Sequence, residues 1–264
     1  MKKQLLQSAA ATVLVMASVA AVGTPAMAQV PVPMPIYNWT GFYLGGNVGY
    51  SWGRGALNYN EPALASFGLP TSISGSNRLN GGIGGVQFGY NWQVATSWVA
   101  GLETDFQVSS ERATRTSAYP FTFNDGESIG IGTLSATLTS KIMSFGTVRG
   151  RFGFLVTPTT LLYATGGLAY GEVGVSGTLT STAGLPGVWS FYQNAFRFGY
   201  AAGAGIEGLI PTTRNWTWKV EYLHIDLGTL SGSGFDNTFG GPFYWNAKFT
   251  DDIARIGFNY HAAP

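Results

Sequence analysis

Cysteine, charge and long apolar runs are scarce or absent in this chain. None of the 264 residues is cysteine, which excludes disulfides and thiolate metal sites. Charged residues make up 10% of the chain, against about a quarter in ordinary soluble domains. The formal net charge of +1 gives no reason to expect nucleic-acid binding. Beyond the N-terminal region, no segment has the ~18 continuous apolar residues of a membrane-spanning helix.

Glycine and aromatic residues are abundant instead. The chain has 38 glycines, and aromatic residues make up 14% of it. Such a composition is unusual for a water-exposed surface. It is typical of a barrel whose outer face meets lipid and ends in aromatic girdles.

The N-terminus has the pattern of a secretory signal peptide. Lys2 and Lys3 precede an apolar stretch, and Ala26-Met27-Ala28 is a small-x-small cleavage site. We therefore expect a signal peptide over residues 1–28; an uncleaved membrane anchor is the alternative. The proline-rich segment 29–40 is expected to be an extended periplasmic leader, and residues 41–264 to be an outer-membrane β-barrel domain.

Eight segments of about ten or more residues alternate between apolar and small or polar positions, as transmembrane β-strands do. Gly41 to Trp52 is the first, with Phe42 and Leu44 on one face and Tyr43 and Asn47 on the other. The pattern predicts an all-β fold, an eight-stranded antiparallel transmembrane β-barrel. The other seven segments are Gly81 to Trp92, Trp98 to Ser109, Thr137 to Phe154, Leu161 to Ser176, Asn194 to Ile210, Trp216 to Leu227 and Phe249 to His261.

The connections between these segments alternate in length. Three short ones, 93–97, 157–160 and 211–215, alternate with four long ones, 53–80, 110–136, 177–193 and 228–248. Short periplasmic turns and long extracellular loops are the pattern of outer-membrane barrels. Aromatic residues near the strand ends predict two girdles at the membrane interfaces. Their main members are Trp52, Trp92, Trp98, Phe152, Trp218, Tyr222 and Tyr260.

Strand parity places nine charged residues on the face opposite the lipid. Two interpretations stay open: a charged pathway for ions, or a salt-bridged filling of a narrow lumen, which we favour because eight strands leave room only for side chains. These expected lumen residues are Glu103, Asp105, Lys141, Arg149, Arg151, Glu207, Lys219, Glu221 and Arg255.

No catalytic or metal site and no cofactor are expected. The two histidines, His224 and His261, are far apart in the sequence, and no serine near His224 completes a nucleophilic pattern. The expected long loops are rich in aromatic residues, which favour either a ligand or adhesion surface or strand extensions that fold together above the membrane. These residues are Trp189, Phe191, Tyr192, Phe235, Phe239, Phe243, Tyr244 and Trp245.

Several segments carry a family resemblance. Tyr37-Asn38-Trp39-Thr40-Gly41-Phe42-Tyr43-Leu44-Gly45-Gly46-Asn47-Val48-Gly49-Tyr50 resembles the opening strand of the alphaproteobacterial porin-like outer-membrane proteins, the outer-membrane immunogenic or RopB-like surface antigens. Val148-Arg149-Gly150-Arg151-Phe152-Gly153, Lys219-Val220-Glu221-Tyr222-Leu223 and Ile256-Gly257-Phe258-Asn259-Tyr260 extend the likeness. The resemblance implies an eight-stranded barrel of outer-membrane protein A type, and members are described as envelope-integrity proteins, antigens and sometimes porins.

The leading functional hypothesis is a structural, surface-exposed barrel that supports the cell envelope without catalysis. A small diffusion porin with a narrow charged lumen, or an adhesive barrel acting through its aromatic loops, is the alternative. The expected partners are outer-membrane lipid and lipopolysaccharide, the barrel assembly machinery and an extracellular ligand.

Overall fold

A computed structural model of the chain describes residues 37–124, 129–182, 188–237 and 240–262. The expected signal peptide 1–28 and residues 29–36 of the expected leader lie outside these ranges. In the described ranges, no helix has both the length and the apolar character needed to cross a membrane.

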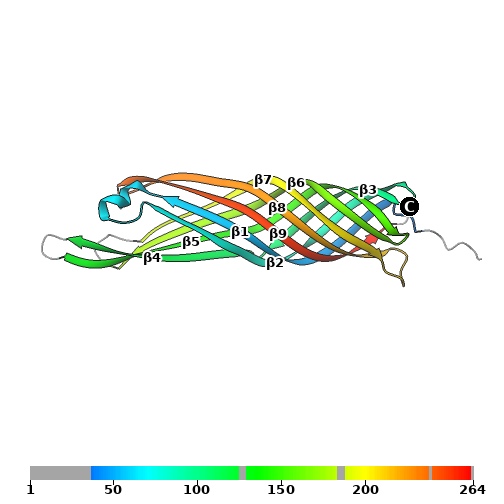
Figure 1. The fold of residues 1–264 in the computed structure, drawn as a ribbon, viewed down its shortest axis with the longest axis horizontal. Helices are drawn as coiled ribbons and strands as arrows, with labels where there is room; N and C mark the ends of the chain where they lie inside the picture. The colour runs from blue at the N-terminus through cyan, green and yellow to red at the C-terminus, as the bar shows by residue number, and fades with distance from the viewer. Residues whose placement is uncertain (1–36, 125–128, 183–187, 238–239, 263–264) are drawn as a thin grey trace, which may run out of the picture. The chain divides into compact units, whose positions relative to one another are not determined.

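Nine antiparallel strands, in the described part of the chain, form one sheet that closes into a barrel (Figure 1). The sheet closes because β1 pairs with both β2 and β9. The strands are β1 (Gly41–Asn60), β2 (Ser72–Ala95), β3 (Trp98–Ser109), β4 (Arg112–Asn124), β5 (Ile129–Thr157), β6 (Thr160–Ser181), β7 (Val188–Leu209), β8 (Trp216–Asp236) and β9 (Gly241–His261).

The extra strand relative to the eight expected is β4, which lies in a segment expected to be a loop. β3 pairs with β5 up to Val108↔Ser144, and β4 continues along the same strand from Arg112↔Lys141. The two strands therefore follow one another on one edge of β5. Ser110 and Glu111 separate β3 from β4.

The three short turns are present, but the long loops were wrongly expected over most of their length. β1 and β2 remain paired to Asn60↔Ser72, and β8 and β9 to Asp236↔Gly241. The longest strand, β5, has 29 residues, more than twice the ~9–11 that span a bilayer. The barrel strands therefore continue well past the region that lipid can cover.

Along the strands, the outer face changes from apolar to polar side chains, and the inner face changes in the opposite sense. In β1, Phe42 to Trp52 point apolar side chains outward, whereas Arg54, Asn58 and Asn60 point outward above them. The inward side chains change in the opposite sense, from polar Asn47 and Ser51 to apolar Leu57 and Tyr59. An apolar exterior suits lipid and a polar one suits water, so the exchange near residue 53 marks one membrane boundary.

Beyond that boundary the barrel divides into two four-stranded sheets. β2 and β4 share only the pair Asn80↔Arg112, and the β7–β8 ladder ends at Tyr200↔Asp226. The first sheet contains the outer parts of β2, β1, β9 and β8, and the second those of β4, β5, β6 and β7. Their apolar inner faces pack together, with Phe191 of β7 stacked 5.7 Å from Trp245 of β9.

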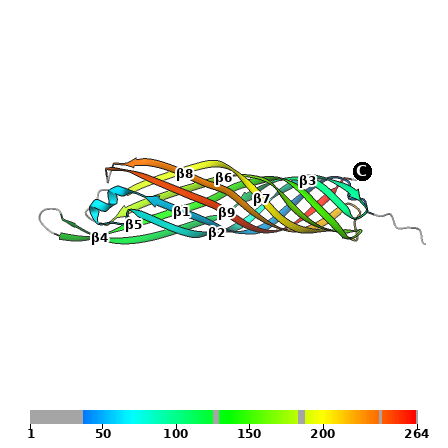
Figure 2. The same cartoon turned by 45° about the horizontal axis from the view of Figure 1, so that its top comes forward.

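Both ends of the barrel interior hold apolar side chains. The short 3-10 helix η1 (Pro62–Phe67) lies at the outer end (Figure 2) and buries Leu64 completely. At the short-turn end, Trp39 is fully buried among Val99, Leu155 and Leu161, and its indole donates a hydrogen bond to the Pro158 carbonyl. Residues 37–40, expected to belong to the leader, thus form part of the barrel domain.

Candidate functional site

Between the two apolar ends, a network of paired charges occupies the barrel interior. Arg149 of β5 contacts Asp105 and Glu103 of β3 and Glu221 of β8, with its Nη2 3.0 Å from Asp105 Oδ2. Arg255 of β9 lies 2.8 Å from the same Asp105 oxygen and also contacts Glu221. These side chains are at most 2% exposed. Both the acidic and the basic side chains of these pairs are therefore buried away from water.

A second group of charges lies closer to the short turns. Arg151 Nη2 is 2.6 Å from Glu207 Oε2, and its guanidinium stacks 4.1 Å above the Tyr163 ring. Lys219 Nζ lies 2.9 Å from Glu103 Oε2, which joins the two groups. Four carboxylates and four cations therefore meet in one buried network, whose members are Glu103, Asp105, Glu207, Glu221, Arg149, Arg151, Lys219 and Arg255.

Lys141 is not in this network, and its expected place in the lumen was wrong. A β-bulge between Ile142 and Ser144 shifts the register of β5. Because side chains alternate along a strand, one inserted residue exchanges the two faces. Lys141 therefore points outward, where its ammonium lies 5.2 Å from the Tyr192 ring.

Several side chains outside the predicted set also bond to the network, among them the rings of Tyr43, Tyr163 and His261. Tyr43 donates a hydrogen bond of 2.8 Å to Glu103, and Tyr163 one of 2.8 Å to Glu221. His261 Nε2 lies 3.2 Å from Glu207 Oε1. All three occupy positions of their strands that point inward. The alternation of side chains could therefore have identified them, if the prediction had also considered uncharged polar rings and the last residue of the final strand.

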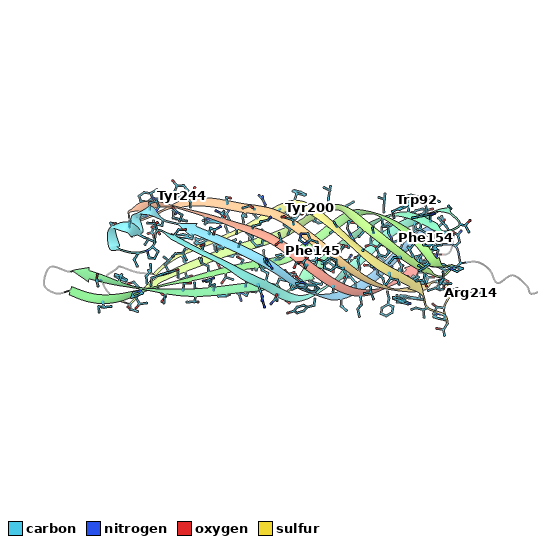
Figure 3. The ribbon with its side chains drawn as sticks, viewed as in Figure 1. Trp92, Phe145, Phe154, Tyr200, Arg214 and Tyr244 are labelled. Carbon is cyan, nitrogen blue, oxygen red and sulfur yellow. The ribbon has the colours of Figure 1, made fainter. Side chains whose placement is uncertain are left out.

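The predicted girdle residues lie on the outer face. Six of them are 42–53% exposed and Trp218 is half-buried. Near the short turns, Trp98 stacks on Phe152 at 5.0 Å, in the region where Figure 3 labels Trp92 and Phe154. Near the opposite boundary, Trp52 lies 6.4 Å from Tyr222. The rings therefore gather at the two ends of the apolar outer band.

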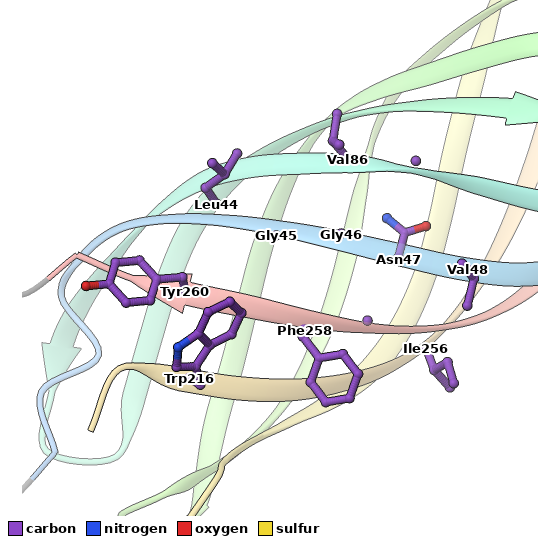
Figure 4. A pocket seen from close by; sticks show the side chains of 12 residues that line it. Leu44, Gly45, Gly46, Asn47, Val48, Val86, Trp216, Ile256, Phe258 and Tyr260 are labelled. Atoms are coloured by element: carbon purple, nitrogen blue, oxygen red, sulfur yellow. The ribbon is translucent and has the colours of Figure 1, made fainter. Parts of the chain in front are cut away.

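A groove of about 650 Å³ crosses the outer face between β1, β2 and β9 (Figure 4). Its floor includes Gly46 and Gly257, and Leu44, Trp216 and Phe258 form its sides. The groove faces the side that we assign to lipid, and its lining is almost wholly apolar. Its chemistry suits an acyl chain.

Two buried carboxyl groups lie just beyond the membrane boundary. Asp251 accepts a hydrogen bond from Ser51, and Glu111 accepts one of 2.9 Å from Ser109. No basic side chain among the described residues is bonded to either. Burial, together with the neighbouring Asp251 charge, raises the pKa of Glu111 to about 8, and burial raises the pKa of Asp251 to about 6.

A row of cations crosses the outer face at the same boundary. Arg54 of β1 is directly opposite Arg78 of β2, and both point outward beside a hollow that Trp52 and Asn80 also line. Arg112 of β4 pairs with Asn80 and then with Lys141 of β5. Like charges on directly opposite strand positions repel each other. Asp252, a carboxylate that lines the same hollow, offsets part of this repulsion.

His224 lies on the outer face at this level. Its Nδ1 is 2.8 Å from Asp252 Oδ1, and Tyr222 donates a hydrogen bond to the same oxygen. Within the described ranges, no group of three or more His, Cys, Asp or Glu side chains is arranged to hold a metal ion.

The aromatic residues of the expected long loops divide between the core and the surface. Phe191, Phe243 and Trp245 pack between the two outer sheets, whereas Tyr192, Phe235 and Tyr244 are more than half exposed. Figure 3 places Tyr244 near η1. Phe239 and the side chain of Trp189 lie outside the described residues. The surface members are therefore held on strands.

Comparisons with known proteins identify a family model and named relatives, all of outer-membrane proteins. The family model described as outer membrane protein beta-barrel domain matches residues 12–261. The 31 kDa outer-membrane immunogenic protein of Brucella melitensis biotype 1 is 36% identical over 237 residues, 88% of each chain. The 22 kDa outer membrane protein of Rhizobium leguminosarum bv. viciae is 32% identical over 193 residues, 73% of this chain and 66% of the relative. The solved structure of OprG from Pseudomonas aeruginosa covers 85% of this chain and 98% of its own, with 9% identity and a TM-score of 0.42.

Proposed function

Because the chain belongs to the family of outer-membrane proteins with a β-barrel domain, we propose that it is a closed, non-catalytic barrel that supports the envelope and holds a rigid two-sheet domain outside the cell. The short turns then face the periplasm, and the two outer sheets with η1 face the medium. This orientation follows the usual arrangement of short periplasmic turns in such barrels.

The single observation that carries this proposal is the filling of the interior at three successive levels. Trp39 and its neighbours occupy the periplasmic end, the balanced charge network occupies the middle, and the apolar core of the two sheets occupies the outer end. The central cations Arg149, Lys219 and Arg255 are completely buried as side chains. A conducting pore needs polar groups that water can reach.

The membrane-spanning part of the barrel has eight strand positions around its circumference. β3 and β4 follow one another beside β5, so they occupy one position in succession. Eight strands give an interior that side chains alone can fill. This count supports a solid barrel over a water-filled one.

Planar-bilayer conductance of the refolded mature protein tests the proposal. Heat-modifiable mobility on a gel first confirms that the barrel has folded. We expect no steady unitary current from the native protein, and none from an Arg54→Gln variant as an outward control. Steady currents whose ion selectivity changes in Arg149→Gln would overturn the closed barrel in favour of the diffusion porin.

The outward cation row is proposed to bind phosphate groups of lipopolysaccharide. Arg54, Arg78, Arg112 and Lys141 lie at the boundary where the phosphates of an outer-leaflet lipid would be, and arginine binds phosphate through paired hydrogen bonds. Replacing Arg54 and Arg78 with Gln should weaken retention of lipopolysaccharide during purification, whereas replacing the outward Asn58 and Asn60 with Gln should not.

A ligand or adhesion surface on the outer sheets is the second candidate function. Tyr192, Phe235 and Tyr244 are exposed aromatic side chains beyond the membrane boundary, and such residues are common at binding sites. Single substitutions of these residues with Ser test this function without unfolding the domain. Deleting 235–245 would remove Phe243 and Trp245 from the core, so it cannot separate binding from folding.

A further inference from the structure

The outer parts of β7 and β8 face each other without pairing. Their ladder ends at Tyr200↔Asp226, although β7 extends from Val188 and β8 continues to Asp236. A bulge between Asp226 and Gly228, with Gly228 at a φ of 75°, follows directly after the last pair of this ladder. Each strand is then paired on one side only, with β6 or with β9.

This open seam, β7 residues 188–199 facing β8 residues 228–236, has little protection. Protected strand edges commonly carry charges or proline. The other seam is protected in that way, because Pro120 lies on β4 and the Arg115 side chain lies against Gly75 of β2. In the β7–β8 seam, Arg197 is the one cation among the described residues, and β8 has no charge between Gly228 and Phe235.

Arg197 partly bridges the seam and retains unused hydrogen-bonding capacity. Its Nη2 donates a hydrogen bond of 2.5 Å to the Thr229 carbonyl of β8, while its Nε is buried without a partner in the described structure. Beside it on β7, Phe196 and Phe198 are 57% and 71% exposed. Exposed aromatics next to unpaired strand edges indicate a surface that another strand covers.

We propose that this seam is the contact between two copies of the chain in the outer membrane. Copies in one membrane share their orientation and depth. A two-fold axis along the membrane normal places β7 of each copy opposite β8 of its partner. Since β7 and β8 run in opposite directions, both contacts are antiparallel, and the interface is closed because each copy offers both edges. The proposal depends on the membrane orientation and not on whether the lumen conducts.

Cysteine cross-linking tests the contact directly because the natural chain has no cysteine. Continuing the β7–β8 register past the bulge brings Asn194 opposite Ser233, and both side chains are exposed. Asn194→Cys and Ser233→Cys proteins with different tags are produced together in outer membranes and oxidised. We expect a cross-linked pair carrying both tags. The matched control pair is Ser74→Cys with Ala118→Cys, which continuing the Asn80↔Arg112 register brings opposite each other at the protected seam, and we expect no cross-link there.

A single chain carrying both Asn194→Cys and Ser233→Cys distinguishes closure within a copy from contact between copies. Only disulfides between chains support the proposal; a bond within one chain, or yields equal to those of the control seam, would overturn it. In a detergent-solubilised sample, Asn194→Lys combined with Ser233→Lys places like charges directly opposite each other at both contacts and should weaken the dimer about tenfold or more. A folded native protein that sediments as a monomer at all concentrations would also overturn it.

Discussion

The buried charges of the barrel are stabilising only as complete pairs. Arg151 and Glu207 show this best, because they lie 2.6 Å apart with almost no exposure. Replacing Arg151 with Met leaves Glu207 charged and buried, and we expect a loss of about 3–5 kcal/mol in the free energy of unfolding. The double variant Arg151→Met with Glu207→Gln should recover most of this loss. Urea unfolding of the refolded barrel in detergent measures each value.

The outward Arg54→Met variant is the control for this prediction, since Arg54 is exposed above the membrane boundary. Its effect should stay within about 0.5 kcal/mol. If Arg151→Met were equally mild, water would have to reach the interior, and the closed-barrel proposal would lose its basis.

Glu111 gives the outer domain a pH dependence of defined sign. Its pKa is raised to about 8 in the folded chain, so the folded state binds a proton that the unfolded chain releases at lower pH. The associated stability is complete below the ordinary glutamate pKa near 4.5 and is lost as pH rises toward 8. We expect Glu111→Gln to be more stable than the native protein at pH 8, by about 1–3 kcal/mol, and to unfold with a flatter pH profile.

The measurement is the urea midpoint at pH 5 and at pH 8, with Glu172→Gln as a control on the outer face. A native midpoint that rises between these two values would contradict the raised pKa. The lower shift of Asp251, to about 6, should add a smaller decline of the same sign at lower pH.

At the scale of a single strand, the bulge in β5 places Lys141 on the outer face, whereas Lys219 belongs to β8. Lys219 lies inside, 2.9 Å from Glu103, whereas Lys141 lies outside beyond the bulge. Lys219→Met should therefore cost about 3–5 kcal/mol, and Lys141→Met less than about 1 kcal/mol. The comparison of their unfolding midpoints checks the register. Equal losses would mean that β5 keeps a single alternation across residues 141–145.

The same bulge explains where sequence reasoning succeeded and failed. Alternation alone predicted the inward positions of eight of the nine expected lumen charges, because each lies in an uninterrupted strand segment. Lys141 failed because no local signal near Ile142 distinguishes a bulge from regular pairing. His261 and Tyr43 were missed for a different reason: the prediction followed charge, and their contribution to the network comes from hydrogen bonds.

Strand length was the larger error, and its cause is physical. Above residue 53 in β1 the apolar side chains turn inward and the polar ones outward, the reverse of the pattern for a lipid-facing strand. Segments 53–80 and 228–248 therefore looked like polar loops rich in Gly, Ser and Asn. Only the three-dimensional pairing shows that they continue β1, β2, β8 and β9 as a water-exposed structure with an apolar core.

For the whole molecule, this inversion requires that the membrane cover only part of the barrel. Single cysteines test it without background in a cysteine-free chain. On β1, Val48 and Asn58 both point outward, but Val48 lies in the apolar band and Asn58 lies beyond it. In intact cells, a membrane-impermeant maleimide should label Asn58→Cys readily and leave Val48→Cys unlabelled. The inward Leu57→Cys, 3% exposed in its native form, separates exposure to water from mere position beyond the membrane, and it should become reactive only on unfolding. Labelling of Leu57→Cys in folded protein would mean that the two outer sheets open to water, whereas protection of Asn58→Cys would move the membrane boundary outward along the strands.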